Sequence, residues 1–297
     1  MDAFLLRHPG FSTRLMDKMG KLFSAYLGID INIGSKPVTF VALDDDQQAL
    51  AIGEGDVSDA LAYAAGQMSG ALVAINAAPH PNQGRMKRDE VRRKLKPIPP
   101  KGRFLHLRQV EYELIQAGIG VTETPDSPDR SLPWVRRGFL LVEQLEEMGY
   151  RAFSADDEPG AEAPTERRQW LETRTDAAFW SLLGVVPLPA GTLEGRIQRQ
   201  LALLDEELKV PDAMVFFEEI TRFKLLKSNL PTKNIFSQAE INAWTAAHTA
   251  WLAANASSGT GSRLKRRISW QIRSIAGSIA CGSTPADTAQ GPGPRPP

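Results

Sequence analysis

The sequence has a single cysteine, no net charge and no long hydrophobic run, and each shortage excludes a class of protein. Cys281 stands alone among 297 residues, so it can form neither a disulfide within the chain nor a multi-cysteine metal site. The 35 basic residues balance 35 acidic ones, so any contact with nucleic acid must come from a local patch. A reducing compartment and a cytoplasmic location fit this composition best.

Apolar segments are too short for a membrane protein. No stretch reaches the ~18 apolar residues that a membrane span requires. The apolar run at residues 3–6 is stopped at once by Arg7, His8 and Pro9, so it is too short for the core of a signal peptide. We therefore expect no integral membrane segment, and a hydrophobic content of 42% permits a sizeable buried core.

What the sequence does contain is a carboxylate inside an apolar strand. Residues 26–35, Tyr-Leu-Gly-Ile-Asp-Ile-Asn-Ile-Gly-Ser, place Asp30 between isoleucines and continue into a glycine turn. A buried carboxylate needs a cationic partner such as a metal ion, a basic side chain or the metal of a phosphate-bearing ligand. The alternative is that Asp30 only caps the turn. We favour a functional role because a turn cap does not require the flanking apolar residues.

The order of predicted elements indicates a mixed sheet. Three strands are predicted in quick succession, at residues 26–33, 37–43 and 48–53. Their short connections favour an antiparallel meander. A helix at 57–68 then leads to a buried strand at 71–75, which a right-handed crossover makes parallel to the first strand. This topology brings Asp30 close to Asn76.

Residues 80–103 form the most basic segment of the chain. Its cations are Arg85, Lys87, Arg88, Arg92, Arg93, Lys94, Lys96, Lys101 and Arg103. Pro97, Pro99 and Pro100 interrupt any helix, and Asp89 and Glu90 dilute the charge. The segment is either a solvated surface loop or a track for an anionic polymer that crosses the site. Nucleic acid held by the basic loop 85–103 is the partner that the second interpretation predicts.

Two further acids occupy unusual positions. Glu111 falls within the apolar side of a predicted helix, where Arg108 could neutralise it. Glu111 is therefore either part of an internal ion pair or a metal ligand or general base. Glu172 ends a short strand that begins near Trp170, which repeats the arrangement at Asp30. A later helix opens on a Ser-Gln-Ala-Glu capping box at 237–240 and carries His248, which we interpret as a hydrogen-bonded core residue.

The ends of the chain are predicted to lie outside one domain at residues 26–255. Residues 1–25 have apolar positions at helical spacing and are expected to form a helical extension. After a linker, residues 263–280 combine arginines with isoleucines at helical spacing, as in a basic amphipathic helix that contacts a membrane surface or a partner. An extra packed helix or simple disorder is the alternative. The Pro/Gly tail at 285–297 is expected to be disordered.

Seven short motifs, each weak alone, occur in an order that is similar to one family. The motifs are Gly28-Ile29-Asp30, Val73-Ala74-Ile75-Asn76-Ala77-Ala78-Pro79, Arg108-Gln109-Val110-Glu111-Tyr112-Glu113-Leu114, Glu172-Thr173-Arg174-Thr175, Thr192-Leu193-Glu194-Gly195-Arg196, Phe217-Glu218-Glu219-Ile220-Thr221-Arg222 and Glu240-Ile241-Asn242-Ala243-Trp244. Residues 26–255 thereby resemble domain-of-unknown-function family 429, a group of predicted nucleases with a ribonuclease H-like fold. The resemblance implies an α/β fold with a mixed sheet, flanking helices and a large helical insertion and C-terminal part.

The same resemblance implies a set of site residues. Asp30, Glu111 and Glu172 would be catalytic ligands of Mg²⁺ or Mn²⁺, which activates water for phosphodiester hydrolysis. The phosphate would be held by arginines, namely Arg85, Arg108 and Arg196.

The chain also departs from the family pattern. Asn76 and Asn242 stand where the family has aspartates, and Thr175 stands where it has proline. A lysine expected near Pro189 and a closing strand are missing as well. Two lost carboxylates weaken any metal site.

Three functions remain as hypotheses. The first is a metal-dependent nuclease, and the second is a catalytically inactive binding or scaffold member of the same family. The third is an actin-like ATPase or sugar kinase, whose opening motif resembles the stretch from Asp30 to Ser35. That fold requires a second acidic, glycine-rich loop, and residues 258–261 lack both the acid and a preceding strand.

Overall fold

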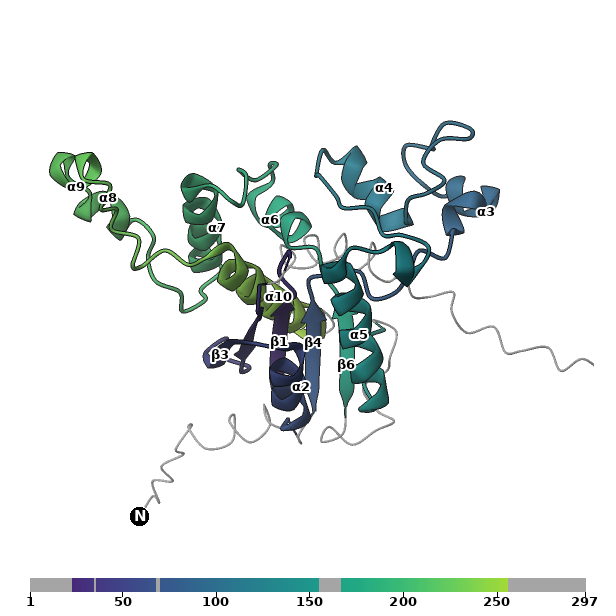
Figure 1. Cartoon of the computed structure of the whole chain (residues 1–297), viewed down its shortest axis with the longest axis horizontal. Helices are drawn as coiled ribbons and strands as arrows, with labels where there is room; N and C mark the ends of the chain where they lie inside the picture. The colour runs from purple at the N-terminus through teal and green to yellow at the C-terminus, as the bar shows by residue number, and fades with distance from the viewer. Residues whose placement is uncertain (1–22, 35, 68–69, 155–166, 256–297) are drawn as a thin grey trace, which may run out of the picture.

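The computed structural model describes residues 23–34, 36–67, 70–154 and 167–255, and its centre is a six-stranded mixed sheet in the order β3-β2-β1-β4-β6-β5 (Figure 1). The strands are β1 (Ala25–Asp30), β2 (Val38–Leu43), β3 (Ala49–Gly55), β4 (Ala71–Ile75), β5 (Arg151–Ala152) and β6 (Arg168–Glu172). The first three strands pair antiparallel, whereas β1, β4, β6 and β5 pair parallel. The predicted α/β class, the meander and the parallel strand at 71–75 are confirmed.

The first strand ends earlier than predicted. β1 stops at Asp30 because Asn32 has a φ of 59°, which lies in the left-handed region and cannot continue a strand. The Asn32 amide donates to Pro37 O at 2.5 Å and to Thr39 Oγ1 at 3.2 Å, and these bonds hold the turn into β2. Asp30 is therefore the last residue of β1, at the edge where β4 and β6 also end.

Both faces of the sheet are covered by helices. Helix α10 (Gln238–Asn255) packs on one face, against Tyr26 of β1 and Leu72 of β4. The helices α2 (Val57–Ala65) and α5 (Pro133–Glu147) pack on the other face, against Leu27 and Val73 (Figure 1). Alternate residues of each central strand therefore belong to different cores, as the twofold period of a strand requires. Such a sheet is buried on both sides, which explains why the central strands read as continuous apolar runs.

A glycine lets α10 lie close against β1. A Cβ at Gly28 would collide with Ala243 O and Ala247 N of the helix backbone. The facing side of α10 is rich in alanine, so the helix approaches the strand closely enough to bring its first turn to the end of β1. That approach places Asn242 beside Asp30.

His248 is a core residue, as predicted. Its ring is buried, its Nδ1 lies 2.9 Å from Gln47 Oε1, and it stacks on Trp251. Burial lowers the pKa of His248 to about 4, so the ring is neutral at pH 7.

The remaining elements of the described residues are helical. They are the 3-10 helices η2 (Arg85–Lys87) and η3 (Pro128–Arg130) and the helices α3 (Asp89–Arg92), α4 (Gln109–Gln116), α6 (Thr175–Leu183), α7 (Leu193–Asp205), α8 (Val215–Glu219) and α9 (Arg222–Leu226). Within the described ranges no helix has the length and apolar character needed to cross a bilayer. The predicted helical extension at 1–25 falls almost wholly outside the described residues, as do the segment 263–280 and the Pro/Gly tail.

Candidate functional site

Asp30 is held by two amide side chains. Its side chain is almost fully buried, with Asp30 only 4% exposed. Its Oδ1 accepts a hydrogen bond from Asn76 Nδ2 at 2.7 Å, and its Oδ2 accepts one from Asn242 Nδ2 at 3.3 Å. Asn76 directly follows β4 and Asn242 is the fifth residue of α10, so the predicted proximity of Asp30 and Asn76 is confirmed.

Burial raises the pKa of Asp30 to about 6, although the hydrogen bonds from Asn76 and Asn242 act in the opposite direction. Two neutral amides stabilise a carboxylate less than a cation does, so they offset only part of the desolvation. Asp30 therefore changes protonation in the weakly acidic range, which is unusual for an aspartate.

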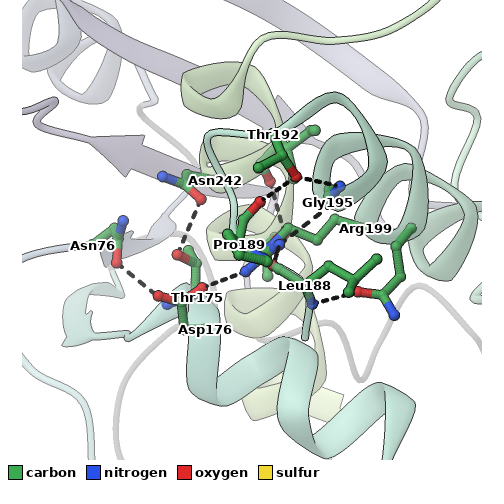
Figure 2. A network of polar contacts seen from close by, with 12 residues as sticks. Asn76, Thr175, Asp176, Leu188, Pro189, Thr192, Gly195, Arg199 and Asn242 are labelled. Carbon is green, nitrogen blue, oxygen red and sulfur yellow. Dashed lines mark hydrogen bonds and ion pairs between the residues drawn. The ribbon is translucent and has the colours of Figure 1, made fainter. Parts of the chain in front are cut away.

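Thr175 sets the orientation of both amides. Its backbone N–H donates to Asn76 Oδ1 at 3.3 Å, and its hydroxyl donates to Asn242 Oδ1 at 3.1 Å (Figure 2). An amide whose oxygen accepts from Thr175 must turn its NH₂ group toward Asp30, because the two ends of the amide have opposite hydrogen-bonding roles. Asn76, Asn242 and Thr175 thus belong to one network with Asp30.

Glu172 is compensated in a different way. It ends β6, is buried, and pairs with Arg108 through two bonds, Nη1 to Oε1 at 2.9 Å and Nη2 to Oε2 at 2.5 Å. Arg174 Nε adds a third bond to Oε1 at 3.2 Å. Burial opposes ionisation of Glu172, but the charges and hydrogen bonds of Arg108 and Arg174 outweigh it and hold its pKa below the usual value. Glu172 is therefore a carboxylate with two cations already bound.

Glu111 points inward, as predicted, but its partners differ from those expected. Its Oε2 accepts from the backbone N–H of Arg108 at 2.9 Å, which closes the start of α4. Its Oε1 accepts from Thr124 N at 2.9 Å and Thr124 Oγ1 at 2.5 Å. Arg174 Nη2 lies 3.8 Å from Oε1, and the charge of Glu111 also contributes to raising the pKa of Arg108. The Arg108 guanidinium is thus paired with Glu172, and Glu111 serves to fix a helix and a loop.

The described residues include no group of three or more His, Cys, Asp or Glu side chains placed to hold a metal ion. Asp30, Glu111 and Glu172 lie in one region, yet each carboxylate is directed at its own protein donors. Turning Asn76 or Asn242 to offer its oxygen to an ion would break a bond to Thr175. The donor set in this conformation does not fit Mg²⁺, which prefers charged oxygen ligands.

A cavity of about 470 Å³ opens beside Asp30. It lies at the carboxyl ends of β1 and β4, where the strand order reverses direction and where ligands of open α/β sheets commonly bind. Polar lining residues include Asp30, Lys36, Asn76, Arg174, Thr175 and Asn242. Trp134, Leu114 and Ile119 supply apolar walls. The size suits a small molecule or one unit of a polymer.

The predicted phosphate-binding arginines do not gather at this cavity. Arg108 is buried against Glu172, and Arg85 donates to Gln83 Oε1 at 3.1 Å. Arg196 reaches Phe236 O at 3.5 Å. None of the three lines the cavity, whereas Arg174 does. Sequence reasoning gave Arg174 and Thr175 no role, although their position directly after the strand-ending Glu172 was a signal for the functional edge.

A second network holds the wall of the site in place. Arg199 Nη2 binds Asp176 Oδ1 at 2.7 Å, and Nη1 binds Leu188 O and Gly195 O (Figure 2). The guanidinium also lies over the ring of Phe179, at 5.3 Å from its centroid. Arg199 therefore ties α6, the following loop and α7 together, and it keeps the first turn of α6 at the cavity.

The basic segment folds onto α4. Arg92 is buried and donates to four backbone carbonyls, those of Met86, Pro99, Pro100 and Arg103. Met86, Leu95, Leu107 and Tyr112 form a small core beneath it. Its exposed cations are Lys87, Arg88, Arg93, Lys94, Lys96, Lys101 and Arg103. We name residues 85–103 the basic platform, since they form a folded surface and not a loose loop.

Comparison with known proteins adds no relative: no family model, no curated protein and no solved structure matches the chain. Its function therefore has to be inferred from the site.

Proposed function

We propose that this chain is a ribonuclease H-like protein that binds nucleic acid without hydrolysing it. The sheet order supports the fold, because an antiparallel meander followed by the parallel strands β4 and β6 is the arrangement that the family resemblance implies. The observation that carries the loss of hydrolysis is the network of Asp30, Asn76, Asn242 and Thr175. In this network the Asp30 oxygens accept hydrogen bonds from amide groups whose orientation is fixed by Thr175. A metal-dependent nuclease would instead have further carboxylates at these positions to bind the ion.

The backbone at Thr175 is compatible with a proline, which supports the idea that the site can be converted. Thr175 is the first residue of α6, a position that accepts proline because its N–H has no partner within the helix. Arg174 before it has φ −125° and ψ 105°, which a following proline also permits. Threonine here supplies the two donors that orient the amides, and proline could supply neither.

The basic platform supports nucleic acid as the ligand. Its cations are exposed and its fold is anchored to α4, whose Leu114 lines the cavity. Phosphate contacts of this kind bind without sequence preference and weaken steeply with salt.

Binding is tested by fluorescence anisotropy with a labelled single-stranded oligonucleotide in EDTA. We expect binding that weakens with salt, and a further loss of about tenfold in Lys94→Glu. Arg136→Glu is the matched control, because it reverses one exposed charge on α5. Equal affinity for both variants would contradict the role of the platform.

Hydrolysis is tested with the same oligonucleotide in Mn²⁺. The wild-type chain should leave it intact, and the triple variant Asn76→Asp, Asn242→Asp, Thr175→Pro should acquire cleavage. Cleavage by the wild type that disappears in Asp30→Asn would overturn the proposal.

The second candidate is the metal-dependent nuclease itself. The placement of Asp30 and Glu172 at the ends of β1 and β6, on either side of β4, favours it, since a metal site could use acids at that edge. It requires Glu172 to leave Arg108, and Mn²⁺ binding by the wild type would support it.

A further inference from the structure

Residues 211–236 form an arm between α7 and α10 that extends away from the sheet, with α9 near its far end (Figure 1). The buried side chain of Gln200 binds both ends of this arm. Its Nε2 donates to Pro211 O at 2.7 Å and to Asn234 O at 2.8 Å, and its Oε1 accepts from Phe236 N at 2.8 Å. The base of the arm also has its own small apolar cluster, formed by Ile197, Ala213, Phe216 and Ile235. The base is thus a fixed part of the domain.

The end of the arm, residues 221–230, has the opposite character. Phe223 is 71% exposed, Leu225 60% and Leu226 73%. At ~100° per residue, Phe223 and Leu226 lie on one side of α9 and Leu225 on the other. We name residues 221–230 the arm tip. Its large apolar side chains point outward around a short helix, so they have no core to pack into.

The charges of the arm tip all have one sign, whereas the base of the arm also carries Asp212, Glu218 and Glu219. Arg222, Lys224, Lys227 and Lys233 are the only charged residues between Ile220 and Phe236. Long basic side chains beside exposed apolar ones are the composition of segments that lie in a bilayer interface, where the cations meet anionic headgroups and the apolar groups enter the acyl boundary.

Other occupants fit this surface less well. Two copies of the arm tip would bring like charges together. A helix that docks in a protein groove presents its anchors on one face, whereas Phe223 and Leu225 here lie ~160° apart around α9. Nucleic acid would engage the cations but leave the leucines without a counterpart. The interface of a lipid bilayer can surround the arm tip on all sides, so it can contact the basic and the apolar side chains together.

We propose that the arm tip inserts into the interface of an anionic lipid bilayer and attaches the domain to it. The cations attract the arm tip to the surface, and Phe223, Leu225 and Leu226 enter it. The contact does not use the cavity beside Asp30.

Vesicle flotation with the full chain tests this contact. Vesicles of phosphatidylcholine with about 30 mol% phosphatidylserine are compared with phosphatidylcholine alone. We expect binding to the anionic vesicles, reduced at least about tenfold in the double variant Phe223→Ser, Leu226→Ser. The control Leu140→Ser removes an apolar side chain exposed on α5 and should bind like the wild type.

Insertion is measured separately, with an environment-sensitive dye on Leu226→Cys in a Cys281→Ser background. Its emission should rise with anionic vesicles and stay unchanged with an oligonucleotide. The proposal is overturned if flotation is absent, if the double variant floats as well as the wild type, or if the dye does not respond. It is overturned equally if light scattering shows a dimer that the double variant dissociates, because the occupant would then be a second copy.

Discussion

Asp30 and Glu172 are buried carboxylates at the same edge of one sheet, and they behave in opposite ways. Neutral amides hold Asp30, and its pKa rises to about 6. Two guanidinium groups hold Glu172, and its pKa falls below the usual value. Burial is common to both, so the charge of the partner decides the direction. In both cases protein donors already occupy the carboxylate oxygens, so an added ion would have to displace them.

The largest effect is expected where the ion pair of Glu172 is broken. Arg108→Gln removes the bidentate partner of a buried carboxylate, which should lower the free energy of unfolding by about 3–5 kcal/mol. Urea denaturation measures this change. Arg130→Gln removes the exposed pair with Asp126 and should cost less than about 1 kcal/mol. Similar losses in the two variants would show that Glu172 does not depend on its cation.

Asp30 should make stability fall as pH rises. Because the folded state raises its pKa from 3.8 to about 6, it binds the proton more tightly than the unfolded state, so the stabilisation is complete below pH 3.8 and is lost as pH rises through about 6. The shift corresponds to about 3 kcal/mol.

This effect appears in the difference between the wild type and Asp30→Asn, measured by urea denaturation from pH 4 to pH 7. The difference cancels the contribution of His248. Its lowered pKa has the opposite sign, since that stabilisation is present above pH 6.5 and is lost as pH falls toward about 4. A difference curve without slope would mean that Asp30 is not desolvated as described.

A smaller effect is expected at the residue that orients the amides. Thr175→Val keeps the shape but leaves Asn242 Oδ1 buried without its donor, which should cost about 1–2 kcal/mol. Thr249→Val is the matched control, because the Thr249 hydroxyl donates only to Thr245 O within α10 and that carbonyl keeps its helical environment. Equal changes in the two variants would argue against an orienting role for Thr175.

Local patterns in the sequence predicted much of the fold. Turn lengths and apolar runs gave the meander and the parallel strand, and with them the approach of Asp30 and Asn76. Helical periodicity also placed Glu111 inside, because a period reveals which face a residue occupies.

Partners remote in sequence could not be predicted in the same way. The Arg108 guanidinium binds Glu172, which is 64 residues away in the sequence. Helical periodicity cannot predict this partner, because it is equally consistent with a bond from Arg108 to Glu111. The orientation of Asn76 and Asn242 depends on Thr175, which only the pairing of β4 with β6 brings close. The exposed arm tip shows no sequence signal that distinguishes it from a packed helix.

Calorimetric titration with Mn²⁺ tests most directly the claim that the Asp30 site does not bind a divalent metal ion. The wild type and the triple variant Asn76→Asp, Asn242→Asp, Thr175→Pro are titrated at pH 7.5. We predict no stoichiometric binding by the wild type and one or two ions bound by the triple variant, because the variant restores free carboxylates beside Asp30. Stoichiometric binding by the wild type that Asp30→Ala abolishes would contradict the account.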